Sequence, residues 1–150
     1  MSESVQGTRP RTLLQDLVET PSVSGNERAC AERLVDFFEE HDREVWLDDV
    51  GNVRAPADDG VLLTSHVDTV PGDIPVRVET LPASEARWGG ESGESGANGA
   101  NGANGSAPEG TVDVLWGRGS VDAKGSLAAM AVAAVRTGAS FAGVVGEEVD

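Results

Sequence analysis

Apolar residues recur at helical spacing in two segments near the beginning of the chain. In residues 11–19 they fall on one helical stripe, formed by Leu13, Leu14, Leu17 and Val18. Pro21 follows, so the pattern predicts a first helix that ends before it. A second stripe is formed by Cys30, Leu34, Phe37 and Phe38 and predicts another helix within residues 22–42. Ser24 and Glu27 precede this stripe at capping-box spacing, so we expect their side chains to cap that helix.

Shorter apolar runs separated by turn residues predict strands. Residues 43–49 and 50–55 are typical of a strand, a turn and a short second strand, and residues 56–60 turn the chain again. The uninterrupted run at residues 61–65, VLLTS, is typical of a strand buried on both faces of a sheet flanked by helices.

A hairpin-like region is predicted next, with arms at residues 74–81 and 111–119. Between the arms, residues 89–110 are rich in glycine and contain no large apolar residue. Such a segment cannot bury enough surface to offset the entropy lost on ordering, so we expect a disordered loop.

The end of the chain predicts a helix and a final strand. The small residues of 126–138 form a helix closed by Gly138, and residues 140–146 form another buried strand. With the arm that begins at residue 111, they predict a parallel, right-handed βαβ unit. The expected fold class is therefore α/β, with a largely parallel sheet and helices on both faces in three layers.

Length and charge narrow the class of protein. A chain of 150 residues has the size of one domain. It contains no apolar run of the length that spans a membrane and no apolar signal segment at its start, which predicts a cytosolic location. The 26 acidic and 11 basic residues leave a formal net charge of −15, which argues against nucleic acid and anionic membranes as partners.

The same charge suggests adaptation to salt. At molar salt the Debye length falls to about 3 Å, so the repulsion between surface carboxylates becomes small. We interpret the surface as that of a halophilic protein from a salt-accumulating cell, with an ordinary acidic cytosolic protein as the alternative. Among single residues, Cys30 is expected to pack in the core and His41 to interact with the end of the second helix.

Polar residues that could bind a metal follow three of the predicted strands. His66 and Asp68 follow residues 61–65, Asp122 follows the second hairpin arm, and Glu147 and Glu148 follow the last strand. In an open α/β sheet, ligands bind beyond the carboxyl ends of the strands. Carboxylates gathered there would repel each other unless a cation lay between them, and imidazole with carboxylate suits zinc.

The spacing of these residues suggests different roles for them. On extended backbone His66 and Asp68 point to the same side, where Asp68 can support the imidazole through its side chain or nearby backbone. Glu147 and Glu148 point apart, so one can bind metal while the other acts as a general base. The alternatives are an incidental histidine at a strand end and a solvated acidic turn.

The glycines around Lys124, the only lysine, also suggest a phosphate-binding loop. The segment lacks the GxxxxGK spacing of such a loop, and Asp122 would repel phosphate at the helix entrance, so we exclude that function. Lys124 is then expected to be a solvated residue of the first helical turn.

Four blocks of sequence resemble one enzyme family. In this order, TPSVSGNE, LLTSHVDTVPGDIPVR, WGRGSVDAKGSLAAM and VVGEEVD are similar to the co-catalytic dizinc amidohydrolases and peptidases. That family includes acetylornithine deacetylase, succinyl-diaminopimelate desuccinylase and aminoacylase. Within it, the blocks look most like the subfamily that releases lysine or ornithine from an amino-group carrier protein.

The resemblance implies a role for each candidate residue. His66 would bind one zinc ion, Glu148 the other, and Asp122 would bridge the two, with cobalt or manganese as possible replacements. Asp68 would orient His66, and Glu147 would be the general base that passes a proton to the leaving amine. The substrate would be the amide that joins lysine or ornithine to the carrier protein.

The chain also departs from the family. Family members are more than twice as long and have a further acidic ligand, a final histidine ligand and a lid domain that often forms a homodimer. We therefore expect residues 1–150 to be the amino-terminal part of a catalytic domain, which alone binds zinc weakly and hydrolyses no amide. The alternatives are acetylornithine deacetylase or a related small-acyl amidohydrolase, and an inactive fragment that at most binds or oligomerises.

Overall fold

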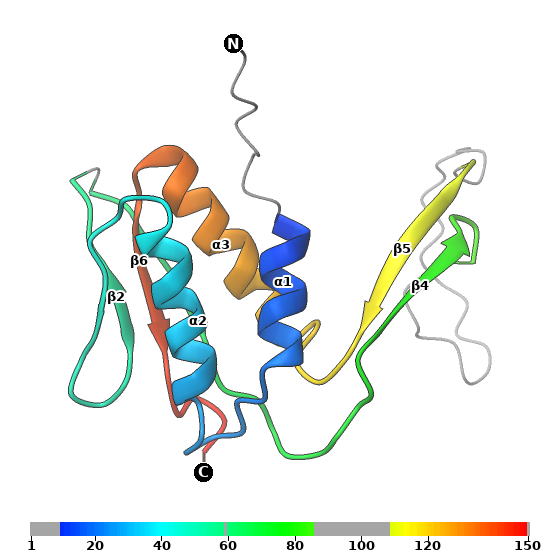
Figure 1. The fold of residues 1–150 in the computed structure, drawn as a ribbon, viewed down its shortest axis with the longest axis horizontal. Helices are drawn as coiled ribbons and strands as arrows, with labels where there is room; N and C mark the ends of the chain where they lie inside the picture. Colours follow the sequence, from blue (N-terminus) through cyan, green and yellow to red (C-terminus); the bar gives the residue numbers. More distant parts are fainter. Residues whose placement is uncertain (1–9, 59, 86–108, 150) are drawn as a thin grey trace, which may run out of the picture. The chain divides into compact units, whose positions relative to one another are not determined.

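The computed structural model describes residues 10–58, 60–85 and 109–149, and Figure 1 shows its ribbon. The chain divides into two compact units, Met1–Val76 with Trp116–Asp150, and Arg77–Leu115. The loop predicted at residues 89–110 lies outside the described residues except for its last two positions.

The predicted helices are all present. They are α1 (Pro10–Glu19), α2 (Arg28–Glu39) and α3 (Lys124–Thr137). The predicted apolar stripes supply the buried residues of α1 and α2 except Ala31, while Leu14 of the first stripe is only partly buried. Helix α3 ends at Gly138, whose φ of 78° is a left-handed conformation that glycine adopts without steric cost. Its N–H donates to the carbonyl oxygen of Ala134 at 2.9 Å and closes the helix as predicted.

The predicted capping box before α2 is wrong. Glu27 is the N-cap residue, and no side chain donates or accepts a capping hydrogen bond there. Instead, the Ser24 hydroxyl donates to the carboxylate of Asp68, and the Glu27 carboxylate accepts from the backbone N–H of Gly146. Both side chains therefore bond to parts of the chain far away in sequence.

Four strands form the sheet of the first unit in the order β1-β2-β6-β3. The strands are β1 (Trp46–Leu47), β2 (Val53–Ala55), β3 (Leu62–His66) and β6 (Ser140–Val144). Strands β3 and β6 pair in parallel, whereas β2 pairs antiparallel with both β1 and β6. The sheet is therefore mixed, and the α/β class is confirmed.

The parallel neighbour of β6 is not the strand that the sequence suggested. Residues 111–116 were expected to pair with it, but β6 pairs with β3, so α3 belongs to the connection between β3 and β6. Residues 111–116 form β5 (Thr111–Trp116), which pairs with β4 (Arg77–Pro82) in the two-stranded sheet of the second unit. The predicted hairpin-like region is thus confirmed.

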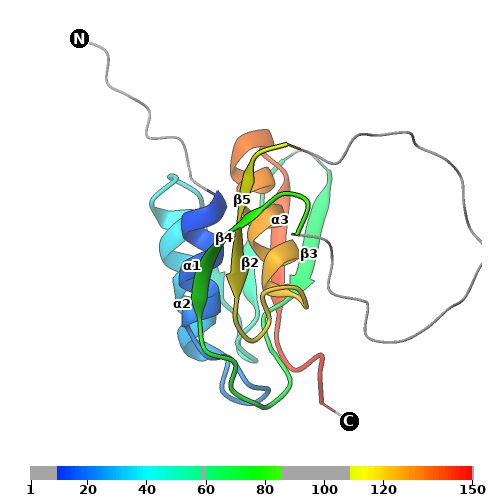
Figure 2. The same ribbon diagram turned by 90° about the vertical axis from the view of Figure 1, so that its right-hand side faces the viewer.

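Within the first unit, the helices lie on one face of the sheet (Figures 1 and 2). Helix α3 packs against β3, β6 and α1, and α2 packs against β1 and β2. The rings of Phe38 in α2 and Phe141 in β6 lie 5.0 Å apart and join the helical layer to the sheet. Strand β3 is an edge of this sheet, and Leu62 is 60% exposed, so β3 is not buried on both faces as expected.

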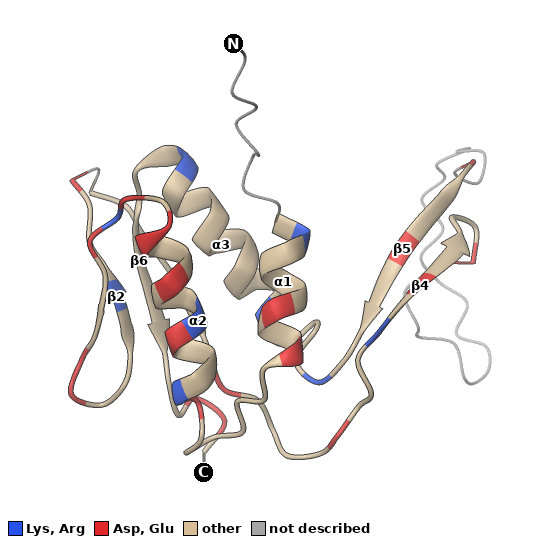
Figure 3. Cartoon of the chain, in the orientation of Figure 1, with Lys and Arg blue, Asp and Glu red and all other residues tan. Residues whose placement is uncertain are grey.

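Lys124 is not a solvated residue. Its side chain is buried in the first turn of α3, where Nζ donates to the carbonyl oxygen of Thr20 at 2.7 Å. Burial lowers the pKa of its ammonium group. Lys124 is the only lysine of the sequence, so the other residues drawn in blue in Figure 3 are arginines, and they lie among more numerous acids.

Two single-residue predictions are confirmed. Cys30 is a buried free thiol in the core cluster. The Nδ1 atom of His41 lies 2.7 Å from the carbonyl oxygen of Phe37 in the last turn of α2. In the described ranges, no helix is both long enough and apolar enough to cross a lipid bilayer.

Candidate metal centre

The parallel pairing of β3 and β6 brings the candidate residues together. His66 is the last residue of β3 and pairs in register with Val144 at the end of β6. Glu147 and Glu148 follow in the turn after β6, and Asp122 lies in the turn just before α3. Carboxyl ends of neighbouring parallel strands lie at the same edge of a sheet, which explains why residues distant in sequence meet here.

The imidazole of His66 lies at the centre of this group. Its Nε2 atom is 3.0 Å from Oδ1 of Asp122 and 3.8 Å from Oε2 of Glu147. One possible ligand atom each from His66, Asp122 and Glu148 lies within 4.8 Å of the others. The His66 side chain is 13% exposed, whereas those of Asp122 and Glu147 are 74% and 57% exposed, so the group is open to solvent on the carboxylate side.

Asp68 is fully buried and forms hydrogen bonds with His66 and with the backbone of Glu147 and Glu148. Its Oδ1 atom accepts a hydrogen bond from the backbone N–H of Glu147 at 3.1 Å, and Oδ2 accepts from that of Glu148 at 2.8 Å. The Nδ1 atom of His66 lies 2.9 Å from the carbonyl oxygen of Asp68 and 3.3 Å from Oδ1. The Ser24 hydroxyl completes this set by donating to Oδ2 at 2.6 Å.

The charges of the group shift two pKa values in opposite directions. Burial by itself would lower the pKa of His66, but the hydrogen bond with Asp122 and the nearby Asp68 and Glu147 raise it above its ordinary value. Burial would raise the pKa of Asp68, but the hydrogen bonds from Ser24, Glu148 and Glu147 hold it below its usual range. These hydrogen bonds favour the ionised form of the buried Asp68 carboxylate.

The donor set fits a divalent metal ion. One imidazole nitrogen and two carboxylate oxygens are ligands that zinc binds in proteins, and cobalt or manganese can use the same atoms. In the part of the chain that the structure describes, this is the one group of histidine, cysteine and acidic residues close enough to hold an ion.

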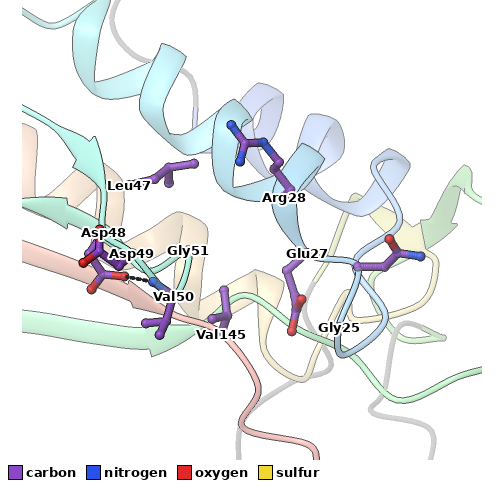
Figure 4. A pocket seen from close by; sticks show the side chains of 10 residues that line it. Gly25, Glu27, Arg28, Leu47, Asp48, Asp49, Val50, Gly51 and Val145 are labelled. Atoms are coloured by element: carbon purple, nitrogen blue, oxygen red, sulfur yellow. Dashed lines mark hydrogen bonds between the residues drawn. The ribbon is translucent and has the colours of Figure 1, made fainter.

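A polar hollow of about 270 Å³ lies between the start of α2 and the turn from β1 to β2 (Figure 4). Glu27, Arg28 and Asp48 are among the residues that line it, and none of the five predicted site residues does. Hydrogen bonds from Asn52 and Arg54 outweigh the opposing effect of desolvation and lower the pKa of Asp48 to about 2. Asp48 thus belongs to the turn and not to the candidate centre.

Sequence reasoning missed the contacts of Ser24 and Glu27 with the centre. Both residues precede a helix at capping-box spacing, and that local signal favoured a cap. Their actual partners lie 44 and 119 residues further along the chain, a separation that carries no periodic signal.

The fold and this group define an α/β chain with a candidate metal centre beyond the ends of two parallel strands. No family model matches the chain. It is 38% identical over 140 residues to a Pyrococcus abyssi protein named LysW-lysine/LysW-ornithine hydrolase, an alignment that covers 90% of this chain and 32% of that relative. A Deinococcus radiodurans protein named LysW-lysine hydrolase is 35% identical over 130 residues, covering 85% of this chain and 27% of the relative.

A third relative carries a different name. An Emericella nidulans protein named as a carboxypeptidase is 38% identical over 137 residues, covering 84% of this chain and 26% of the relative. The chain therefore spans about a third or less of the length of the curated relatives that it matches. The predicted resemblance to the carrier-linked lysine and ornithine hydrolases is confirmed over that length.

Proposed function

We propose that this chain is part of a metal-dependent amide hydrolase that releases lysine or ornithine from an amino-group carrier protein. The observation that carries the proposal is the clustering of possible ligand atoms from His66, Asp122 and Glu148 within 4.8 Å of one another. The names of the Pyrococcus and Deinococcus relatives supply the substrate class, with LysW as the carrier. Such an enzyme would act in the cytoplasm in lysine or arginine biosynthesis.

The metal centre would consist of two zinc ions. His66 would hold one ion and Glu148 the other, and Asp122 would be a ligand that the two ions share. The distance of 3.0 Å between Nε2 of His66 and Oδ1 of Asp122 supports this, because one ion could contact both atoms. When bound, the metal would supply Lewis-acid activation of the amide carbonyl and of a water molecule.

The remaining residues would orient the ligands and move the proton. Asp68 keeps the His66 ring in place, because its backbone carbonyl accepts from Nδ1 and leaves Nε2 facing the centre. The Glu147 carboxylate is more than half exposed and lies 3.8 Å from Nε2 of His66, so it can reach both water and substrate. It would accept a proton from the attacking water and give it to the leaving amine.

Other parts of the enzyme would come from sequence that the longer relatives have beyond the matched length. We propose that these include the remaining zinc ligands, a lid domain that forms a homodimer, and helices on the second face of the sheet. Leu62 on the edge strand β3 is 60% exposed, and an apolar side chain at a sheet edge is suited to being covered by such further sequence.

Metal binding tests the centre directly, and the two histidines of the chain provide a matched pair of variants. Zinc or cobalt titration of this chain should show weak binding that His66→Ala abolishes and His41→Ala leaves unchanged, because His41 bonds to the end of α2. Equal binding by both variants, or no binding by the parent chain at millimolar metal, would refute the proposed centre.

Activity must be tested on a chain with the length of the relatives. It should hydrolyse LysW-linked lysine or ornithine, and Glu147→Gln should remove turnover while metal binding is retained. Residues 1–150 alone should hydrolyse neither substrate. Preference for N-acetylornithine would identify a small-acyl deacetylase, and cleavage of carboxyl-terminal residues from peptides would favour the function named for the Emericella relative.

A further inference from the structure

The segment before α2 runs alongside the residues that follow β3. Val23 and Thr69 form a parallel bridge. The backbone N–H of Thr69 donates to the carbonyl oxygen of Ser22 at 2.9 Å, and that of Ser24 donates to the carbonyl oxygen of Thr69 at 3.3 Å. The Ser22 hydroxyl also donates to the carbonyl oxygen of Val67 at 2.8 Å. The two backbone hydrogen bonds of Thr69 hold Ser24 where its side chain can reach Asp68.

The hydroxyl of Ser24 donates a hydrogen bond to the buried carboxylate of Asp68. The distance from Oγ to Oδ2 of Asp68 is 2.6 Å, and the Asp68 side chain has no exposed surface. Hydrogen bonds from a hydroxyl to an ionised carboxylate are short and stronger than neutral ones. Since Asp68 also accepts from the backbone of Glu147 and Glu148, the Ser24 bond restricts the carboxylate that holds these two residues.

Glu27 makes the neighbouring contact on the same turn. The residue is 8% exposed, and Oε1 of its carboxylate accepts a hydrogen bond from the backbone N–H of Gly146 at 3.1 Å. Gly146 has a φ of 70°, the conformation that turns the chain from β6 into the Glu pair. Three successive N–H groups, at residues 146–148, are therefore held by two buried carboxylates.

We propose that Ser24 and Glu27 are positioning residues for the metal centre. Neither side chain belongs to the group of possible ligands, so both act through other residues. Glu27 fixes Gly146 at the start of the turn after β6. Ser24 fixes the carboxylate of Asp68, which accepts hydrogen bonds from the backbone of Glu147 and Glu148. A turn that is already ordered loses less entropy when Glu148 binds an ion, which raises the affinity of the centre.

This inference rests on the proposed metal-binding function, and Ser22 supplies a matched control. Ser22 and Ser24 lie in the same segment and both donate from a hydroxyl, but Ser22 bonds to a backbone carbonyl and not to Asp68. Ser24→Ala should weaken zinc or cobalt binding about ten-fold, the loss typical of removing a partner of a ligand-supporting residue. Ser22→Ala should leave the affinity unchanged, and Ser24→Thr, which keeps a hydroxyl, should restore it.

Glu27 is tested in the same titration. Glu27→Gln retains an oxygen that can accept from Gly146 and should bind metal like the parent chain, whereas Glu27→Leu should weaken binding. If Ser22→Ala and Ser24→Ala weaken binding equally, or if Ser24→Thr fails to restore it, Ser24 has only a structural role and the proposal is overturned.

A measurement without metal separates this proposal from the proposed function. Amide hydrogen exchange at residues 146–148 of the metal-free chain should speed up in Ser24→Ala and in Glu27→Leu, and remain unchanged in Ser22→Ala. Faster exchange in a chain that binds no ion would support the positioning contacts and refute the metal centre. Unchanged exchange in Ser24→Ala and Glu27→Leu would overturn the positioning role, whatever the titration shows.

Discussion

Replacing Asp68 with asparagine changes one atom in a buried carboxylate. The two oxygens accept hydrogen bonds from the backbone N–H of Glu147, the backbone N–H of Glu148 and the hydroxyl of Ser24. An asparagine side chain keeps the shape but replaces one oxygen with an NH₂ group, which only donates. In either orientation of the amide, this NH₂ group faces one of the two backbone N–H groups that donate to the carboxylate.

The expected cost follows from these contacts. Each hydrogen bond to a charged acceptor contributes about 1.5–3 kcal/mol, and a buried donor left without a partner costs about 1–3 kcal/mol. If the asparagine oxygen takes the place of Oδ2, the hydrogen bonds from Ser24 and Glu148 remain but weaken, because the negative charge is gone. The hydrogen bond from the backbone N–H of Glu147 is then lost. We therefore expect Asp68→Asn to lower the free energy of unfolding by about 2–4 kcal/mol.

Urea unfolding of the metal-free chain, followed by far-UV circular dichroism, measures this loss. The control is Asp73→Asn in the exposed segment after β3, which should change the free energy of unfolding by less than about 0.5 kcal/mol. A double-mutant cycle with Ser24→Ala should give a coupling energy above zero, because the two side chains share a hydrogen bond. An Asp68→Asn variant as stable as the Asp73→Asn control would refute this account of the centre.

Four further predictions concern the rest of the fold. Leu34→Ala should lower the free energy of unfolding by about 2–5 kcal/mol in urea, because the side chain is fully buried, and a loss below about 1 kcal/mol would contradict its place in the core. Gly119→Ala should destabilise the chain in the same assay, since φ is 78° and an added Cβ would lie 2.7 Å from Cγ2 of Thr69; unchanged stability would mean that this turn relaxes freely. The pKa of Asp48 falls from 3.8 to about 2 on folding, so the ionised carboxylate contributes fully to the free energy of unfolding above pH 3.8, and this contribution is lost as the pH falls towards 2. Asp48→Asn should therefore be less stable than the parent chain at neutral pH and equally stable near pH 2. A difference in stability that persists in acid would show another cause. With a net charge of −15, the chain should melt at a higher temperature in molar potassium chloride than in dilute buffer, and equal melting temperatures would contradict adaptation to salt.

Local patterns in the sequence determined the helices and the positions of the candidate ligands. Helical periodicity reports which face of a segment is apolar, so α1 and α2 could be predicted from residues a few positions apart. The ends of apolar runs likewise located His66, Asp122 and Glu148, and the rule that ligands gather beyond strand ends predicted that they meet. The rule accounts for His66 and Glu148, which follow the parallel neighbours β3 and β6, whereas Asp122 reaches the group from the turn before α3 and not from a strand of that sheet.

Tertiary packing alone decided the strand order, the buried Lys124 and the contacts of Ser24 and Glu27. Lys124 bonds to a carbonyl 104 residues earlier in the chain, and Glu27 bonds to an N–H 119 residues later. A polar side chain at a helix start has the same local sequence signal whether it caps the helix, faces water or reaches a distant segment. The choice is made by desolvation, because a buried polar group needs whichever partner the packed elements place within reach.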